Sequence, residues 1–137
     1  MRLINVHTEA FDRKNCDAHA ERLAGLVRAN PARTILLGDF NTVPPEARLQ
    51  HGFPDEPETD MREDRAIALL RAVPGLREVI SAEGYATDEP AWFTFPAWEP
   101  NRRLDYLFHG EGLALRQARV QRGTASDHLP ILARFGI

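Results

Sequence analysis

The sequence has few of the features that mark secreted, membrane-spanning or strongly basic proteins. It contains one cysteine, Cys16, which cannot form an internal disulfide, so we expect a reducing, cytoplasmic location. No apolar run approaches the length of a membrane span, and nothing at the start resembles a secretory signal. The formal net charge of −3 lacks the electrostatic footprint of a protein that binds nucleic acid indiscriminately, although carboxylates that hold a metal would themselves make a site acidic.

Several catalytic signatures are also missing. The sequence has no glycine-rich phosphate loop, no CxxC pair and no GxSxG motif, which disfavours the enzyme classes built on them. There are no internal repeats and no low-complexity segments. With 137 residues, 43% hydrophobic and 27% charged, the chain is predicted to form one soluble globular domain over residues 1–137.

The most informative stretch is residues 35–41, Ile-Leu-Leu-Gly-Asp-Phe-Asn. A short apolar run that ends in glycine predicts a buried strand followed by a loop. In open α/β sheets ligands bind at the carboxyl ends of such strands, which places Asp39 and Asn41 where chemistry usually occurs. Their side chains suit phosphate chemistry, because a carboxylate can hold a hard cation and an amide can donate to a charged oxygen. The alternative is a polar turn that closes the strand.

The first 40 residues predict a βαβ unit. Residues 2–7 form the first expected strand, which ends at His7. Residues 14–30 show a helical apolar stripe made by Cys16, Ala20, Leu23 and Val27. The connection back to the strand at residue 35 is expected to be right-handed, with the two strands parallel. His7 alone could be a structural hydrogen-bonding group as well as a catalytic one.

The remaining pattern is mixed and becomes β-rich towards the end. We expect helices at residues 46–50 and 61–72, loops at 51–62 and 85–90, and strands at 76–80, 92–95, 102–108, 113–120 and 131–135. Asp105 interrupts an apolar strand, where a carboxylate is costly unless it is paired. It could form an ion pair with Arg102 or Arg103, or it could orient a catalytic histidine. Likewise, Asp127 and His128 could be capping and turn residues, or they could be a metal ligand beside a general base.

Three short motifs occur in a recognisable order. They are Gly38-Asp39-Phe40-Asn41, Arg103-Leu104-Asp105-Tyr106 and Ser126-Asp127-His128-Leu129-Pro130, with His7 upstream. Together they resemble the endonuclease/exonuclease/phosphatase superfamily, which includes pancreatic-type deoxyribonucleases, abasic-site endonucleases, sphingomyelinases and inositol polyphosphate phosphatases. The string Thr94-Phe95-Pro96-Ala97 is similar to the segment that precedes the family's third motif.

The resemblance implies an α/β fold that is half of, or a truncated form of, a four-layer α/β sandwich, with a mixed β-sheet and flanking helices. The chain resembles the C-terminal half of that sandwich. The family's N-terminal motifs, which supply an Asn and a metal-binding Glu, have no counterpart here. Nor does the acidic partner of the histidine matched by His7; Glu9 lies nearby but does not match the family motif.

The resemblance also implies a reaction, the metal-assisted in-line attack of water on a phosphoester. His128 would act as general base or as a partner of the transition state, and Asp105 would orient it. Asp127 would bind a divalent cation, Mg²⁺ or Mn²⁺, because its ligands are hard oxygens. Asp39 would align the attacking water or share the cation.

Asn41 and His7 would complete the implied site by donating hydrogen bonds to the phosphoryl oxygens of the transition state. The family acts on nucleic acids, phospholipids and sugar phosphates, and the fold does not choose among these phosphoester substrates.

A second hypothesis needs no catalysis. A chain that lacks half of the sandwich would leave one face of its sheet uncovered, and soluble monomers rarely expose such an apolar surface. The chain would then be a non-catalytic half-domain that binds a partner or forms a homodimer covering the exposed sheet face.

Overall fold

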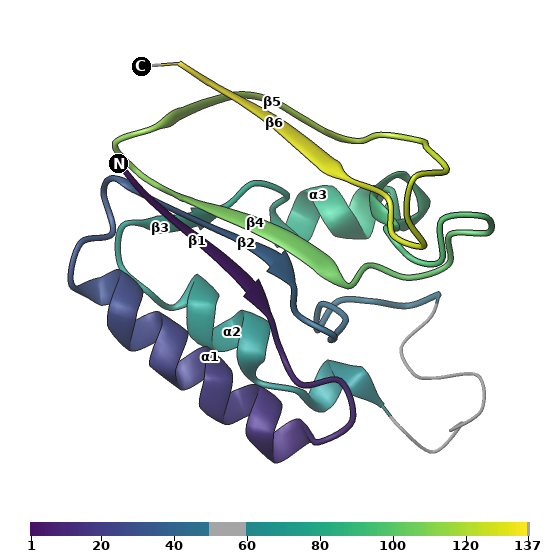
Figure 1. Cartoon of the computed structure of the whole chain (residues 1–137), viewed down its shortest axis with the longest axis horizontal. Coiled ribbons are helices and arrows are strands. Elements are labelled where there is room, and N and C mark those ends of the chain that lie inside the picture. Colours follow the sequence, from purple (N-terminus) through teal and green to yellow (C-terminus); the bar gives the residue numbers. More distant parts are fainter. Residues whose placement is uncertain (50–59, 137) are drawn as a thin grey trace.

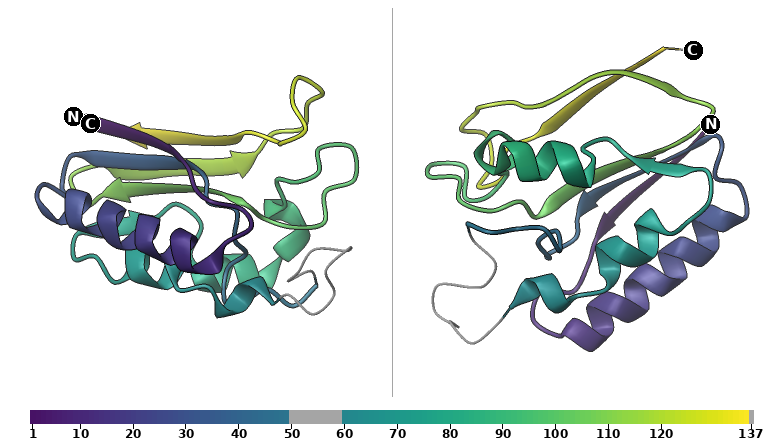
Figure 2. Two further views of the ribbon diagram at one scale, coloured as in Figure 1. Left: turned by 60° about the horizontal axis from the view of Figure 1, so that its bottom comes forward. Right: turned by 180° about the vertical axis from the view of Figure 1, so that it is seen from behind.

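The computed structural model describes residues 1–49 and 60–136. Its elements, in chain order, are β1 (Arg2–His7), α1 (Arg13–Arg28), β2 (Thr34–Asp39), the 3₁₀ helix η1 (Met61–Glu63), α2 (Ala66–Arg71), β3 (Leu76–Glu78), α3 (Ala82–Thr87), the 3₁₀ helix η2 (Glu89–Trp92), β4 (Asp105–Gly110), β5 (Ala114–Val120) and β6 (Ile131–Gly136). The strands lie on one side of the molecule and the long helix α1 on the other (Figures 1 and 2). Within the described ranges no helix is long and apolar enough to cross a membrane.

The predicted unit of strand, helix and strand is present. Helix α1 begins after Asp12, whose side chain accepts a hydrogen bond from the backbone N–H of Asn15, the usual N-cap arrangement. The four apolar residues of the predicted stripe are all buried, together with Ala24. Strands β1 and β2 are adjacent and parallel, as expected, so that His7 lies beside Asp39 at their carboxyl ends.

A close approach between β1 and β2 requires the glycine at position 38. Gly38 has φ of 140°, a conformation that side chains rarely adopt, and an added Cβ would overlap the backbone oxygen of Val6. The glycine in the predicted motif is therefore needed for the close packing of β1 against β2. It allows β1 to lie against the end of β2, immediately before Asp39.

The main sheet is mixed and has the strand order β1-β2-β4-β3. Strand β4 runs antiparallel to β2, and its first residue, Asp105, is directly paired with Asp39, the last residue of β2. Side chains alternate between the two faces of a strand, so the opposed Asp39 and Asp105 share one face. That face also carries Leu3, Leu37 and Leu107, while the other face packs on α1 and α2.

Strands β5 and β6 form a separate antiparallel pair. Their inward side chains join a second apolar cluster that includes residues of β2, β4 and the segment from β3 to η2. The ring of Phe135 on β6 lies 5.1 Å from that of His109 on β4. The inward residues are only half-buried: Leu115, Ala118, Ile131, Ala133 and Phe135.

The structure corrects several predicted element boundaries. Residues 46–49 form no helix, and residue 50 and most of the predicted acidic loop lie outside the described residues. The helix expected over residues 61–72 is divided into η1 and α2 because Asp64 adopts an extended conformation. The loop expected at 85–90 contains parts of α3 and η2, because Ser81 caps α3 through the N–H of Gly84.

Several predicted strands are shorter than expected; the one expected at 76–80 ends at Glu78. Of the strand expected at 92–95, only Phe95 pairs, through an isolated bridge to Arg102, because Pro90 favours the short helix η2. The strand expected from residue 102 begins at Asp105. The mixed sheet with flanking helices agrees with the predicted fold class.

Candidate active site

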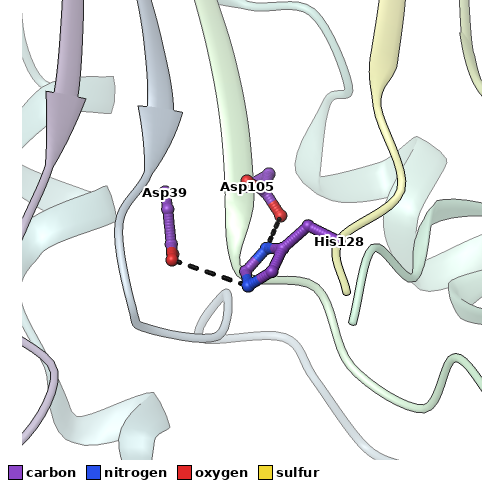
Figure 3. A group of neighbouring side chains, drawn as sticks. All are labelled: Asp39, Asp105 and His128. Carbon is purple, nitrogen blue, oxygen red and sulfur yellow. Dashed lines mark hydrogen bonds and ion pairs between the residues drawn. The ribbon is translucent and has the colours of Figure 1, made fainter. Parts of the chain in front are cut away.

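Three side chains from distant parts of the chain meet at the ends of β2 and β4 (Figure 3). The Nδ1 atom of His128 lies 2.8 Å from Oδ2 of Asp105, a hydrogen-bonding distance. Its other nitrogen, Nε2, lies 3.8 Å from Oδ2 of Asp39, too far for a direct hydrogen bond. The imidazole is therefore held at one end, and its second nitrogen faces a carboxylate across a small gap.

Of the two ion pairs considered for Asp105, the one with Arg103 is not formed. The guanidinium of Arg103 forms its ion pair with Glu78 instead, with Nη2 and Oε1 2.6 Å apart. Arg103 contacts Asp105 only through the backbone, because its Nε donates to the carbonyl oxygen of Asp105 at 3.2 Å. The Asp105 carboxylate is paired with His128, which is the arrangement expected for an orienting residue.

The surroundings shift the pKa of His128 and of Asp39 upwards. Burial alone would lower the pKa of His128, but the hydrogen bond and charge of Asp105 outweigh it and raise the value above its usual 6.5. The pKa of Asp39 is raised by burial first and then by the charge of Asp105, against the hydrogen bond from the Asn41 backbone. Two carboxylates that face each other create a negative site that favours a cation.

His7 and Asn41 lie at the same edge of the sheet. The exposed ring of His7 has its Nε2 3.6 Å from Oδ2 of Asp39. The Asn41 side chain donates through Nδ2 to the carbonyl oxygen of Thr8 at 3.0 Å, and its backbone N–H donates to Oδ1 of Asp39 at 2.8 Å. Asn41 has φ of 48°, a left-handed conformation that asparagine tolerates better than most residues. It thus fixes the turn that follows β2.

Asp127 precedes His128 in the sequence, but its side chain is less closely associated with Asp39, Asp105 and His128 in space. Its side chain is exposed, and one carboxylate oxygen accepts a hydrogen bond from the Ser126 hydroxyl at 3.2 Å. Among the described residues, the donors that lie within 4.8 Å of one another belong to Asp39, Asp105 and His128. The carboxylate oxygens of this group are the hard ligands that a divalent cation such as Mg²⁺ prefers.

A cavity opens beside the three residues. It has a volume of about 460 Å³ and is lined by Asp105 and His128 together with residues of β2, β4, the segment from Gly123 to Pro130, and Ile131. Its apolar walls come from Leu37, Leu107 and Leu129 among others. This volume lies within the usual range for small-molecule sites, about 300–1,000 Å³.

The sequence motifs contain Phe95 and Ser126, but no role at the site was predicted for either residue. The ring of Phe95 packs on His128 with ring centroids 4.8 Å apart, and the Ser126 hydroxyl accepts a hydrogen bond from the His128 backbone N–H at 3.1 Å. Glu78, the partner of Arg103, was not predicted either. The sequence around Glu78 showed only a charged pair, Arg77-Glu78, between apolar residues.

The geometry of these residues suits general base chemistry. An imidazole fixed by a carboxylate at Nδ1 can accept a proton at Nε2, and the resulting charge is stabilised by that carboxylate. The adjacent Asp39 offers oxygens to a cation or to a water molecule.

The fold is shared with solved structures, although no curated protein matches the chain. A 3′ phosphatase, NExo, from Neisseria, bound to product DNA hairpin, is 21% identical, with a TM-score of 0.69 over 98% of this chain and 61% of that one. A mannosyl-6-phosphatase from Bacteroides thetaiotaomicron is 17% identical, with a TM-score of 0.59 over 98% and 51% of the two chains. The human Nocturnin catalytic domain is also 17% identical, with a TM-score of 0.58 over 98% and 46%.

The chain thus spans between about half and three-fifths of the length of these three structures. At the level of sequence, residues 5–128 match the model of the Endonuclease/Exonuclease/phosphatase family, a range that contains the first two motifs, the third as far as His128, and the three residues Asp39, Asp105 and His128. The chain therefore belongs to the Endonuclease/Exonuclease/phosphatase family.

Proposed function

We propose that this chain is a divalent-metal-dependent phosphoester hydrolase in which His128 activates water for in-line attack on phosphorus. The observation that supports this most directly is the 2.8 Å contact between His128 Nδ1 and Asp105 Oδ2. It leaves Nε2 directed at the space beside Asp39 (Figure 3). A water molecule in that space would give its proton to Nε2 as its oxygen bonds to phosphorus and the opposite bond, from phosphorus to the ester oxygen, breaks. Asp105 would stabilise the imidazolium, and the departing alcohol oxygen would take a proton from solvent.

The other residues of the site would bind the cation or stabilise the negative charge of the phosphoryl oxygens. Asp39 and Asp127 would hold the cation, which when bound supplies positive charge to neutralise the phosphoryl oxygens, and Mg²⁺ or Mn²⁺ suits these ligands. His7, beside Asp39, would donate to the phosphoryl oxygens, as would the second N–H of the Asn41 side-chain amide, whose first N–H bonds to Thr8. Removing such a donor costs about 3 kcal/mol of transition-state stabilisation.

The substrate is proposed only as a class. NExo is described as a 3′ phosphatase with a DNA product, and the Bacteroides protein as a mannosyl-6-phosphatase. For this chain we propose a phosphoester of a nucleic acid, a phospholipid or a sugar, in the reducing cytoplasm, where the free, buried Cys16 would remain a thiol.

The proposal is tested by phosphodiesterase assays with bis(p-nitrophenyl) phosphate in Mg²⁺. His128→Ala is expected to lower kcat by about 10²–10⁴-fold, the contribution of a positioned general base, and Asp39→Ala should abolish Mg²⁺-dependent turnover. His19→Ala is the matched control, because His19 is exposed on α1, away from the site. Full activity in either site variant would refute the assigned role.

One observation favours a second candidate function, self-association. Leu3 on β1 is 65% exposed on the sheet face that also carries Leu37. The inward residues of β5 and β6 are also half-buried. An exposed apolar face of this kind is typical of an interface, and we propose a homodimer that covers it.

Light scattering over a range of concentrations tests the dimer. We expect a concentration-dependent dimer, which Leu3→Glu should dissociate by placing a charge on the apolar face. Arg28→Glu, an exposed change at the end of α1, is the control. A wild-type chain that remains monomeric at every concentration would rule out the homodimer.

A further inference from the structure

Thr94 lies between η2 and the start of β4, and it is completely buried. Its hydroxyl oxygen accepts hydrogen bonds from two consecutive backbone N–H groups, those of Leu104 at 3.1 Å and Asp105 at 3.2 Å. Its carbonyl oxygen accepts a third bond, from the N–H of Leu129 at 2.7 Å. One small residue thus contacts two segments that are 24 positions apart in the sequence.

These two segments carry the two members of the hydrogen-bonded pair at the site. Asp105 is itself bonded to Thr94, and Leu129 directly follows His128. On the other side of His128, the carbonyl oxygen of Asp127 accepts a bond from Ala97 at 2.7 Å. The segment from Thr94 to Ala97 therefore holds the backbone on both sides of His128 and at Asp105.

We propose that Thr94 is a positioning residue that keeps Asp105 and His128 within hydrogen-bonding distance of each other. The proposal rests on the proposed function for its kinetic consequence only, since the contact between the two side chains exists without substrate. The hydroxyl is essential to the arrangement because a methyl group in its place would leave two buried N–H groups without this acceptor. The chain would then move at Asp105, where a shift of about 1 Å is enough to reduce turnover strongly.

Three variants separate this role from general stability. Thr94→Val keeps the shape of the side chain and removes the acceptor, while Thr94→Ser keeps the acceptor and removes a methyl group. Thr34→Val is the matched control: Thr34 is also completely buried, and its hydroxyl is hydrogen-bonded to Arg2 and to the carbonyl oxygen of Asn30. Thr34 begins β2, at the end opposite Asp39, so its loss should affect stability alone.

The first measurement is the low-field proton NMR signal of the His128 Nδ1–H group, assigned by its loss in His128→Ala. We expect Thr94→Val to lose this signal or shift it upfield, and Thr94→Ser and Thr34→Val to keep it. The second measurement is kinetic. Thr94→Val should lower kcat by about 100-fold with little change in KM, as expected for a misplaced catalytic group, and Thr94→Ser should restore it.

The outcomes are decisive in each case. A folded Thr94→Val that keeps the wild-type signal would overturn the proposal, as would loss of the signal in Thr94→Ser. If Thr94→Val fails to fold, Thr94→Ser decides: a retained signal supports the hydroxyl as the feature that matters, and a lost signal contradicts it. If the wild type hydrolyses no phosphoester, the proposed function fails, but the NMR comparison still tests the positioning role.

Discussion

Two groups of charged side chains lie on either side of the start of β4, and they differ in how their charge is balanced. The balanced cluster consists of Glu46, Arg71, Glu78 and Arg103, two cations and two anions. The site cluster consists of Asp39, Asp105 and His128, two anions and one weak base. Arg103 and Asp105 are separated by one residue, so a single short stretch of chain contributes to both.

The pKa values of the carboxylates show whether a neighbouring arginine offsets the effect of burial. Burial alone would raise the pKa of Glu46, but the hydrogen bonds and charge of Arg71 outweigh it and lower the value. At Asp39, no arginine counters burial, and the pKa is raised. A carboxylate with its own cation is part of the framework, whereas a buried carboxylate without one remains available to an external cation or a proton.

Breaking the balanced cluster should have the largest effect on stability. Arg103 is fully buried, pairs with Glu78 at 2.6 Å and lies with its guanidinium 4.1 Å from the Tyr106 ring centre. Arg103→Met leaves Glu78 as a buried charge with one cation fewer, and we expect a loss of about 3–5 kcal/mol in the free energy of unfolding, measured in urea.

Arg65→Met is the matched control for that measurement. Arg65 and Glu21 are both exposed and lie 3.9 Å apart, so this change should cost less than about 1 kcal/mol. If the two variants unfolded at the same urea concentration, the balanced cluster would not be a structural element.

The site cluster, in contrast, should be stabilised by a cation that binds from solution. A ligand that binds only the folded state stabilises it by about 2.7 kcal/mol at 100 times its dissociation constant. We therefore expect Mg²⁺ to raise the Tm of the wild type and to have little effect on Asp39→Asn, in scanning calorimetry at constant ionic strength. An equal rise in both proteins would mean that the cation binds elsewhere.

The same contrast explains what the sequence could predict. The site residues follow strand ends or interrupt apolar runs, so local pattern marked Asp39, Asp105 and His128 as candidates and the family resemblance suggested their roles; the structure brings these three together. Residues 2–7 and 14–30 were predictable for the same reason, because their periodicity is local.

The supporting residues were not predictable in this way. Glu78 acts through Arg71 and Arg103, and Thr94 acts through the N–H groups of Leu104 and Asp105. Such partners are set by tertiary packing: the string Thr94-Phe95-Pro96-Ala97 resembled a family segment, but it did not show which groups the Thr94 hydroxyl contacts. The short helices α3 and η2 were missed because six-residue and four-residue elements carry little periodicity.

The smallest expected effect is that of the Asp39 charge on the stability of the folded protein. Because the pKa of Asp39 is raised in the folded protein, its charged form opposes folding above the unfolded-state value of about 3.9. Asp39→Asn keeps an oxygen that can accept the bond from the Asn41 backbone and removes the charge. In the absence of divalent cation we expect the variant to be more stable than the wild type by about 0.5–2 kcal/mol near pH 8, the range for substitutions that relieve active-site strain.

This gain should depend on pH in a defined direction. The pKa of His128 is raised, so the imidazole becomes protonated as pH falls through a value above 6.5, and the charge of Asp39, 3.8 Å from Nε2, then becomes favourable. The advantage of Asp39→Asn should therefore shrink or reverse between about pH 7 and pH 5, and disappear below about pH 3.9, where the carboxyl is neutral in both states. Urea unfolding at pH 8, 6 and 3.5 measures this. A constant difference across the three values would show that the Asp39 charge is as well compensated as that of Glu46, and that the two clusters do not differ as described.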